Sequence, residues 1–221
     1  MDESDKAVKF AVNRWTLAAV VACLAAFAVL SWAVRGEAIL ARDVEITRSV
    51  QAWNFPGIDS VCRFMNWIMD GTPATVLAMV LILILAVRRS WWEALVVAGT
   101  IPLRLFNRQI KEIVASPRPT ADLVQVDGSF DGYGYPSGHT TAAVLISGVL
   151  VWLITRRTER RPVQVGVWIL AIVWVVLTAL ARVRVGGHWP SDSVGSVLWA
   201  GPALVLLIWL VQFARSRWVK E

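Results

Sequence analysis

Cysteine and charge are both scarce in this chain of 221 residues. Cys23 lies within an apolar run and Cys62 lies outside one, which excludes a disulfide framework and a cysteine-based metal site. Charged residues make up 17% of the chain and hydrophobic residues 57%, a balance that excludes an ordinary soluble domain. Beside so much apolar sequence, the net charge of +6 indicates contact with anionic lipids, and we expect no nucleic-acid partner.

Six long apolar runs account for this composition. They cover residues 16–34, 72–87, 91–106, 140–155, 163–181 and 193–213. A membrane-spanning helix needs about 20 apolar residues and about 17 can suffice, so the shorter runs must borrow flanking residues. The first run is too long for a signal peptide and lacks a clear cleavage site after it, so we interpret it as a retained helix. The sequence predicts an all-α, polytopic membrane protein with six transmembrane helices in a single domain, residues 1–221.

The basic residues predict how the chain is oriented in the membrane. Six spans put both termini on one side, together with the stretches "KAVKFAVNR", "VRRSWWE", "TRRTERR" and "RSRWVK". These stretches carry 12 of the 22 lysines and arginines. Positive charge is typical of the cytoplasmic side. We therefore expect a multi-pass protein of the cell membrane, with both termini in the cytoplasm.

The segment between the first two runs, residues 35–71, is too polar to span a membrane. Apolar side chains nevertheless recur in it at helical spacing, at Ile58, Val61, Cys62, Met65, Ile68 and Met69. Trp53 and Trp67 flank this apolar face. The pattern predicts a helical segment that lies in the extracytoplasmic interface.

The chain has only two histidines, both at the outer ends of predicted spans. His139 lies in "GYGYPSGHTT" and His188 in "ARVRVGGHWPSD". A lone interfacial histidine is usually an amphipathic anchor, but two on one side among Gly, Pro, Ser, Arg and Asp favour a reactive site. Asp192 follows His188 by four residues, where a carboxylate can fix the imidazole tautomer so that the other nitrogen attacks. The same carboxylate would also suit a cap of the last helix.

Two glycine-containing stretches beside the histidines suit close approach of a ligand or of the backbone. Ser137 is a good N-cap for the fourth predicted span, and Gly138 lets a ligand reach the backbone amides. A helix N-terminus of this kind binds anions, although an ordinary capped helix would look the same. Gly186 and Gly187 predict tight backbone packing next to His188.

Cations gather on the same predicted side. One face of the third predicted span carries a polar stripe of Arg104, Asn107, Arg108 and Lys111. Charges at this depth need a partner or a water-filled cavity, although Arg104 would also reach the interface by snorkelling. Pro117 and Pro119 hold Arg118 in a stiff loop. Such fixed cations suit a phosphate group, and neither a nucleotide-binding loop nor a carboxylate cluster for a metal accompanies them.

Three motifs in this region resemble those of a known family. They are "K-x6-RP" (Lys111, Arg118, Pro119), "PSGH" (residues 136–139) and "R-x5-H-x3-D" (Arg182, His188, Asp192). Their order and spacing resemble the three signatures of the type 2 phosphatidic acid phosphatase superfamily, with a motif core over residues 104–192. Its membrane members are six-helix, metal-independent lipid phosphatases that share their site with vanadium haloperoxidases. The third signature usually begins Ser-Arg, whereas this chain has Ala181 there.

The resemblance implies a role for each motif residue. His188 would be the nucleophile that forms a phosphohistidine, Asp192 would orient it, and His139 would be the general acid. The phosphoryl oxygens would be held by Lys111, Arg118, Ser137, Gly138 and Arg182. Arg104 and Arg108, from the polar stripe, are further candidates for substrate binding. The resemblance implies no metal and no cofactor, and the residues alone do not say which histidine attacks.

The favoured function is therefore hydrolysis of a lipid phosphate at the outer leaflet. Phosphatidic acid, phosphatidylglycerol phosphate and undecaprenyl diphosphate, a phospholipid or isoprenoid class of substrate, all fit the motifs. One alternative is a phosphotransferase that passes the phosphoryl group to another lipid or a sugar. A second is a non-catalytic lipid-binding or transport protein, which the lack of internal repeats disfavours.

Overall fold

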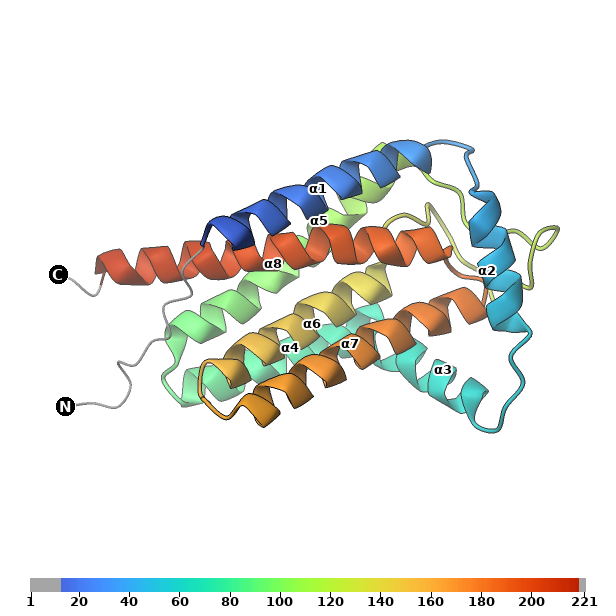
Figure 1. The fold of residues 1–221 in the computed structure, drawn as a ribbon. Coiled ribbons are helices and arrows are strands. Elements are labelled where there is room, and N and C mark those ends of the chain that lie inside the picture. Colours follow the sequence, from blue (N-terminus) through green and yellow to red (C-terminus); the bar gives the residue numbers. More distant parts are fainter. Residues whose placement is uncertain (1–12, 219–221) are drawn as a thin grey trace.

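The computed structural model describes residues 13–218, and all regular structure in this range is α-helical. The helices in chain order are α1 (Arg14–Ala33), α2 (Ala41–Gln51), α3 (Ile58–Ile68), α4 (Gly71–Val87), α5 (Trp91–Val114), α6 (Gly138–Thr155), α7 (Arg161–Arg184) and α8 (Pro190–Trp218). The six long helices run along one bundle, while α2 and α3 lie at one of its ends (Figure 1). The predicted all-α class is confirmed.

Each predicted apolar run coincides with one long helix, but only some of these helices are long and apolar enough to cross a membrane alone. Four of them qualify, namely α1, α6, α7 and α8, and α3 with α4 would make a fifth span bent by 63°. By itself α4, with 17 residues, is too short to qualify. In α5, charged residues interrupt every window of the length of a span. Length and composition therefore support four or five spans of a multi-pass membrane protein.

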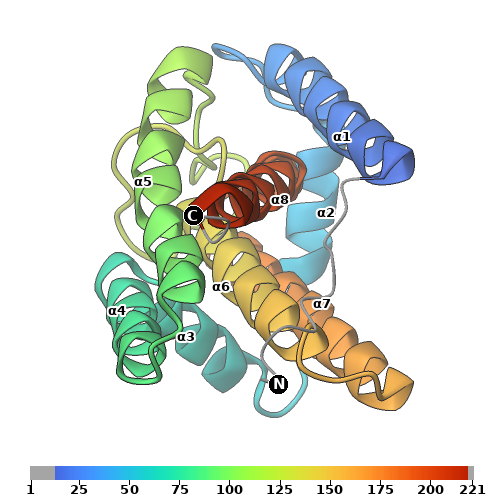
Figure 2. The ribbon, with the colours of Figure 1, turned by 90° about the vertical axis from the view of Figure 1, so that its left-hand side faces the viewer.

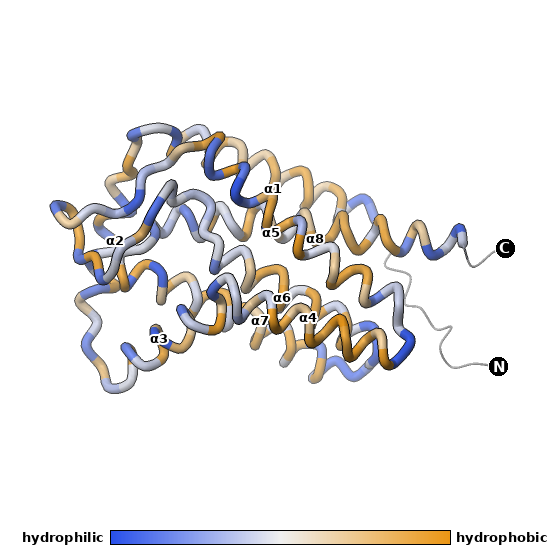
Figure 3. Tube along the Cα trace, turned by 180° about the vertical axis from the view of Figure 1, so that it is seen from behind, coloured by the Kyte–Doolittle hydropathy of each residue, from blue (hydrophilic) through white to orange (hydrophobic). Residues whose placement is uncertain are grey.

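The helices of the bundle differ in how much apolar surface they leave uncovered. In the described structure, 61% of the apolar stretch of α6 is buried, against 6% for α1 and for α7. Viewed along the bundle, α6 and α8 lie between the other long helices (Figure 2). Hydrophobic residues follow the long helices, and hydrophilic residues gather towards the ends (Figure 3). An exposed apolar surface of this extent suits contact with lipid.

The polar segment between α1 and α4 forms two helices where the sequence predicted one helical segment. The predicted apolar face belongs to α3, whose Cys62 and Met65 pack with Ala181 of α7 in one buried cluster. Val61 is the exception, because 40% of it is exposed. The other helix, α2, lies across the end of the bundle and was not predicted (Figure 1). Cys23 and Cys62 are both free, as expected.

The opposite end of the bundle carries the predicted basic stretches. The turns after α4 and α6 lie there together with the end of α8 (Figure 1). Glu93 at the start of α5 pairs with Arg156, at 3.2 Å, and with Arg157, both just after α6. "VRRSWWE" and "TRRTERR" therefore share one end of the molecule. Most of "KAVKFAVNR" and the last residues of "RSRWVK" lie outside the described residues.

Candidate active site

The predicted site residues come from four helix ends and two loops that meet at the α2–α3 end of the bundle. Lys111 lies in the last turn of α5, Arg182 in that of α7, and Asp192 in the first turn of α8. His188 lies in the loop between α7 and α8. It is close enough for the charges of Lys111, Arg182, Arg118 and His139 to act on it. Three segments that are far apart in the sequence thus form one cluster.

His188 and Asp192 form a buried pair. The Nδ1 atom of His188 lies 2.9 Å from Oδ2 of Asp192, and the two side chains are 3% and 0% exposed. The backbone N–H of Trp189 donates to the same Oδ2 at 3.0 Å. The carboxylate therefore both orients the imidazole and closes the first turn of α8, the two roles that the sequence left open. With Nδ1 engaged, Nε2 is the nitrogen that can react.

Arg118 lies directly against that nitrogen. Its Nη1 atom is 3.3 Å from Nε2 of His188 and donates at 2.6 Å to the carbonyl oxygen of Gly187. Its Nε donates to the carbonyl oxygens of Asp131 and Gly132. A phosphoryl group bonded to Nε2 would lie within reach of this guanidinium, whose charge it would share through short hydrogen bonds.

Lys111 is held in a similar way. Its Nζ donates to the carbonyl oxygens of Tyr133, at 2.9 Å, and Gly134, at 3.0 Å. Within residues 13–218 no carboxylate forms an ion pair with Lys111, Arg118 or Arg182. Backbone carbonyls fix Lys111 and Arg118 in place without cancelling their charge, which leaves that charge for an anion.

Arg182 is positioned by two residues that the sequence did not mark. Its Nη1 donates at 3.1 Å to Oδ1 of Asn66 on α3, and its guanidinium lies 5.1 Å from the centre of the Phe130 ring. The same ring lies 5.9 Å from the guanidinium of Arg118. Phe130 thus contacts both arginines by cation–π interaction. The Nε of Arg182 is buried and has no partner among the described residues, so one N–H remains for a ligand.

The environment of His188 favours a neutral imidazole. Burial lowers its pKa well below the usual range for histidine, and the charges of Lys111, Arg182 and Arg118 lower it further. A neutral imidazole whose Nδ1 proton faces a carboxylate keeps a lone pair on Nε2. The pair formed by His188 and Asp192 is therefore suited to nucleophilic attack.

His139 lies in the first turn of α6, next to the predicted N-cap. Ser137 is that cap, and its hydroxyl accepts the N–H of Thr140 at 3.4 Å. The Nε2 atom of His139 lies 3.5 Å from Oδ1 of Asp70, at the junction of α3 and α4. The sequence did not mark Asp70, because nothing in its local pattern connects it with a histidine 69 positions away. An imidazole next to a carboxylate can hold and release a proton.

Gly186 and Gly187 pack as tightly as predicted. Gly186 has a φ of +65°, and a Cβ atom there would overlap the carbonyl oxygen of Gln125. A Cβ atom at Gly187 would overlap Nη2 of Arg182. The loop that carries His188 therefore lies directly against a phosphate-binding candidate and against the loop that follows Arg118.

The polar stripe of α5 separates into residues with different surroundings. Asn107 is buried, donates to the carbonyl oxygen of Pro136 at 3.1 Å, and accepts from Thr141 at 2.9 Å and Trp199 at 3.1 Å. Arg104 donates to Thr75 and to the backbone of Gly71 on α4. Arg108 is exposed. Asn107 thus ties α5 to the "PSGH" loop, whereas substrate binding by Arg104 and Arg108 stays a prediction.

Comparison with known proteins places the chain in a family. The profile of the PAP2 superfamily matches residues 92–217, more than half of the chain. An undecaprenyl-diphosphatase of Sulfolobus acidocaldarius is 33% identical over 96 residues, which are 43% of this chain and 37% of that protein. The phosphatidylglycerophosphatase B of Bacillus subtilis is 24% identical over 173 residues, 76% of this chain and 83% of that protein. The chain spans less than two fifths of the length of several curated relatives that it matches.

A solved structure shares the fold. The crystal structure of a transmembrane PAP2-type phosphatidylglycerolphosphate phosphatase from Bacillus subtilis superposes with a TM-score of 0.73 at 21% identity. The superposition covers 90% of this chain and 96% of that one. It therefore extends to helices that precede residue 92.

Proposed function

This chain belongs to the PAP2 superfamily, and from that membership we propose that it is a membrane-embedded phosphatase of lipid phosphates. The observation that carries the proposal is the His188–Asp192 pair, whose reactive Nε2 faces Arg118 at 3.3 Å. A nucleophile oriented by a carboxylate and surrounded by unpaired cations is what phosphoryl transfer requires. Phosphate monoesters and diphosphates of lipids are the substrate class, as in the relatives whose names mention such substrates.

The proposed reaction has two steps. Nε2 of His188 attacks phosphorus as the bond to the leaving oxygen breaks, and His139 gives its proton to that oxygen. A water molecule then attacks the phosphohistidine and gives a proton to His139, while the phosphorus–nitrogen bond breaks. Inorganic phosphate leaves, and both imidazoles return to their starting states. Lys111, Arg118, Arg182, Ser137 and the Gly138 amide hold the phosphoryl oxygens through both steps.

We expect this activity to persist in EDTA. Lys111, Arg118 and Arg182 supply the positive charge that a divalent ion supplies in metal-dependent phosphatases. The test measures phosphate released from phosphatidic acid, phosphatidylglycerol phosphate and an isoprenoid diphosphate by the purified protein, with and without EDTA. Orthovanadate should inhibit, because it adopts the five-coordinate geometry of the transferring phosphoryl group. Loss of activity on chelation that a divalent metal restores would contradict the mechanism, and a phosphorylated second lipid in place of free phosphate would indicate a transferase.

The proposed topology has six spans in one domain, with the active site outside the cytoplasm and both termini inside. The additional spans are α4 and α5, since Arg104, Asn107 and Lys111 on the polar face of α5 are hydrogen-bonded to α4 and to the loop of the site. The basic turn after α6, which contains Arg156 and Arg157, marks the cytoplasmic end. The active site lies at the other end of the bundle (Figure 1).

We expect single cysteines at the two ends of the molecule to react differently in sealed cells. In a chain with Cys23→Ser and Cys62→Ser, Asp127→Cys should react with a membrane-impermeant maleimide, and Glu159→Cys should react only after permeabilisation. Both positions are exposed, so accessibility within the protein is matched. The reverse pattern would overturn the orientation. Labelling of both in sealed cells would show that α6, the single span between the two positions, does not cross the membrane.

A further inference from the structure

The first turn of α8 carries the carboxylate that orients His188, so the position of this turn decides the direction of the nucleophile. Helix starts leave their first backbone N–H groups without an intrahelical partner. Pro190 has no N–H, so the first such donor inside α8 belongs to Ser191. Oδ2 of Asp192 accepts from His188 and Trp189, and its Oδ1 has no partner among the described residues. The carboxylate of Asp192 therefore does not bond the N–H of Ser191, which needs a different acceptor.

Asp43, in the first turn of α2, supplies that acceptor from 148 residues away in the chain. Its Oδ1 accepts the backbone N–H of Ser191 at 2.9 Å, and its Oδ2 accepts the Ser191 hydroxyl at 2.6 Å. Both residues are buried, with Asp43 4% and Ser191 6% exposed. Burial raises the pKa of Asp43, whereas its hydrogen bonds with Ser191 lower it. A buried carboxylate is tolerated here because both oxygens are bonded.

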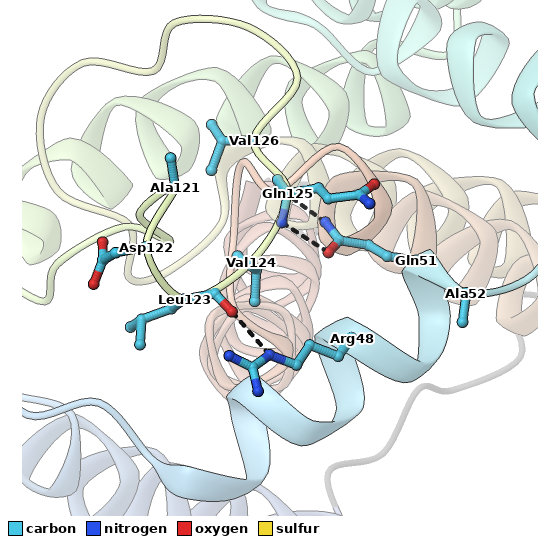
Figure 4. A pocket seen from close by; sticks show the side chains of 9 residues that line it. All are labelled: Arg48, Gln51, Ala52, Ala121, Asp122, Leu123, Val124, Gln125 and Val126. Carbon is cyan, nitrogen blue, oxygen red and sulfur yellow. Dashed lines mark hydrogen bonds between the residues drawn. The ribbon is translucent and has the colours of Figure 1, made fainter.

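The rest of α2 is tied to the two loops that carry the reactive groups. Arg48 donates to the carbonyl oxygen of Leu123 at 2.9 Å, and Gln51 exchanges two hydrogen bonds with the backbone of Gln125, at 2.7 and 3.1 Å (Figure 4). Gln51 also donates to the carbonyl oxygen of Arg184, just before the His188 loop. Because these hydrogen bonds hold α2 against both loops, Asp43 presents its carboxylate to α8 from a fixed position.

We propose that Asp43 is a positioning residue of the reaction, which caps α8 from a separate helix and thereby sets the direction of the His188–Asp192 pair. The inference rests on the proposed phosphatase function. It extends the machinery beyond residues 92–217, because α2 lies outside the part of the chain that matches the family profile. The three sequence motifs assign no role to α2, whereas this proposal does.

The test compares full-length variants in detergent on a lipid monophosphate and on p-nitrophenyl phosphate. Asp43→Ala should lower kcat by about 10²-fold on both substrates, the loss expected for an ångström-scale misplacement of a reacting group. KM should change by less than about 2-fold, because the phosphate-binding cations stay in place. Ser191→Ala, which keeps the backbone bond, should lower kcat less than Asp43→Ala does. Glu45→Gln is the matched control, an exposed carboxylate on the same helix, and should behave as wild type.

The outcomes separate this inference from the proposed function. Wild-type kcat in Asp43→Ala, or a loss confined to KM, would overturn the role of Asp43 while leaving the phosphatase intact. If Asp43→Ala does not fold, the decision passes to Asp43→Asn and Ser191→Ala, and unchanged kcat in both overturns the inference. The double variant Asp43→Ala/Ser191→Ala would support the inference if its kcat is no lower than that of Asp43→Ala alone, because the effects of coupled residues are not additive. A wild-type protein that hydrolyses neither substrate would overturn the phosphatase, and this inference with it.

Discussion

His188→Ala should abolish phosphate release from every substrate. In the proposed mechanism this imidazole forms the bond to phosphorus, and the cations that remain would bind a phosphate without displacing its leaving group. Loss of the nucleophile of a hydrolase lowers kcat by about 10⁶-fold, and we expect a loss of that order. Steady-state phosphate release measures it, and a labelled lipid phosphate tests for the intermediate directly. Wild type should yield an acid-labile, base-stable phosphoenzyme, and His188→Ala should yield none.

Asp192→Asn provides the comparison for this variant. The amide keeps the shape of the side chain but does not accept the Nδ1 proton of His188 as a carboxylate does, so the reactive tautomer is disfavoured. Some activity should remain, because the nucleophile is still present in its pocket. A His188→Ala protein that still forms the phosphoenzyme would show that the covalent bond is made elsewhere.

His139→Ala should show a defect that depends on the leaving group. A general acid contributes about 10²–10⁴-fold, and most where the departing oxygen is strongly basic. The alkoxide of a lipid monophosphate needs the proton, whereas p-nitrophenolate leaves without it. The variant should therefore retain a larger share of wild-type kcat on p-nitrophenyl phosphate than on the lipid, measured side by side. His188→Ala should show no such rescue.

The opposite pattern would reverse the two assignments. If the defect of His188→Ala became smaller with the better leaving group, while His139→Ala were inactive on both substrates and formed no phosphoenzyme, His139 would be the nucleophile. The geometry favours the present assignment. His188 is the histidine whose Nδ1 contacts a buried carboxylate at 2.9 Å, and the partner of His139, Asp70, is 62% exposed at 3.5 Å.

Much of the fold and of the candidate site was predictable because the signals are local. The apolar runs marked all six long helices, since an uninterrupted run of such length has few other stable solutions. Ser137 was recognisable as a cap, and the pairs of glycines and prolines marked the loops. The apolar run ends at residue 106, but the polar stripe already placed Lys111 on the same helix, and α5 extends to Val114 because its last turns are amphipathic.

Residues without a local signal could not be predicted. Asn66, Asp70 and Phe130 have no distinguishing spacing, and each becomes relevant only because its own element packs beside a motif residue. The helix α2 escaped notice because its apolar residues are few and its contacts are hydrogen bonds to distant backbone. Arg104 and Arg108 are the opposite case, because their shared helix face was evident from the sequence but does not give them the same environment. In the structure Arg104 contacts α4, whereas Arg108 is exposed.

The sequence by itself determined the membrane class, the six apolar helices and the three motifs that carry His139, His188 and their cations. These follow from composition and from spacings of a few residues. Within one helix or loop, such a spacing directly fixes where the side chains lie relative to one another. Only the tertiary structure decided that Asp43 caps α8 and that Phe130 lies against two arginines. It also decided that Nε2 of His188 faces Arg118. Such contacts join segments up to 148 residues apart, and they depend on how whole helices pack, which no local pattern encodes.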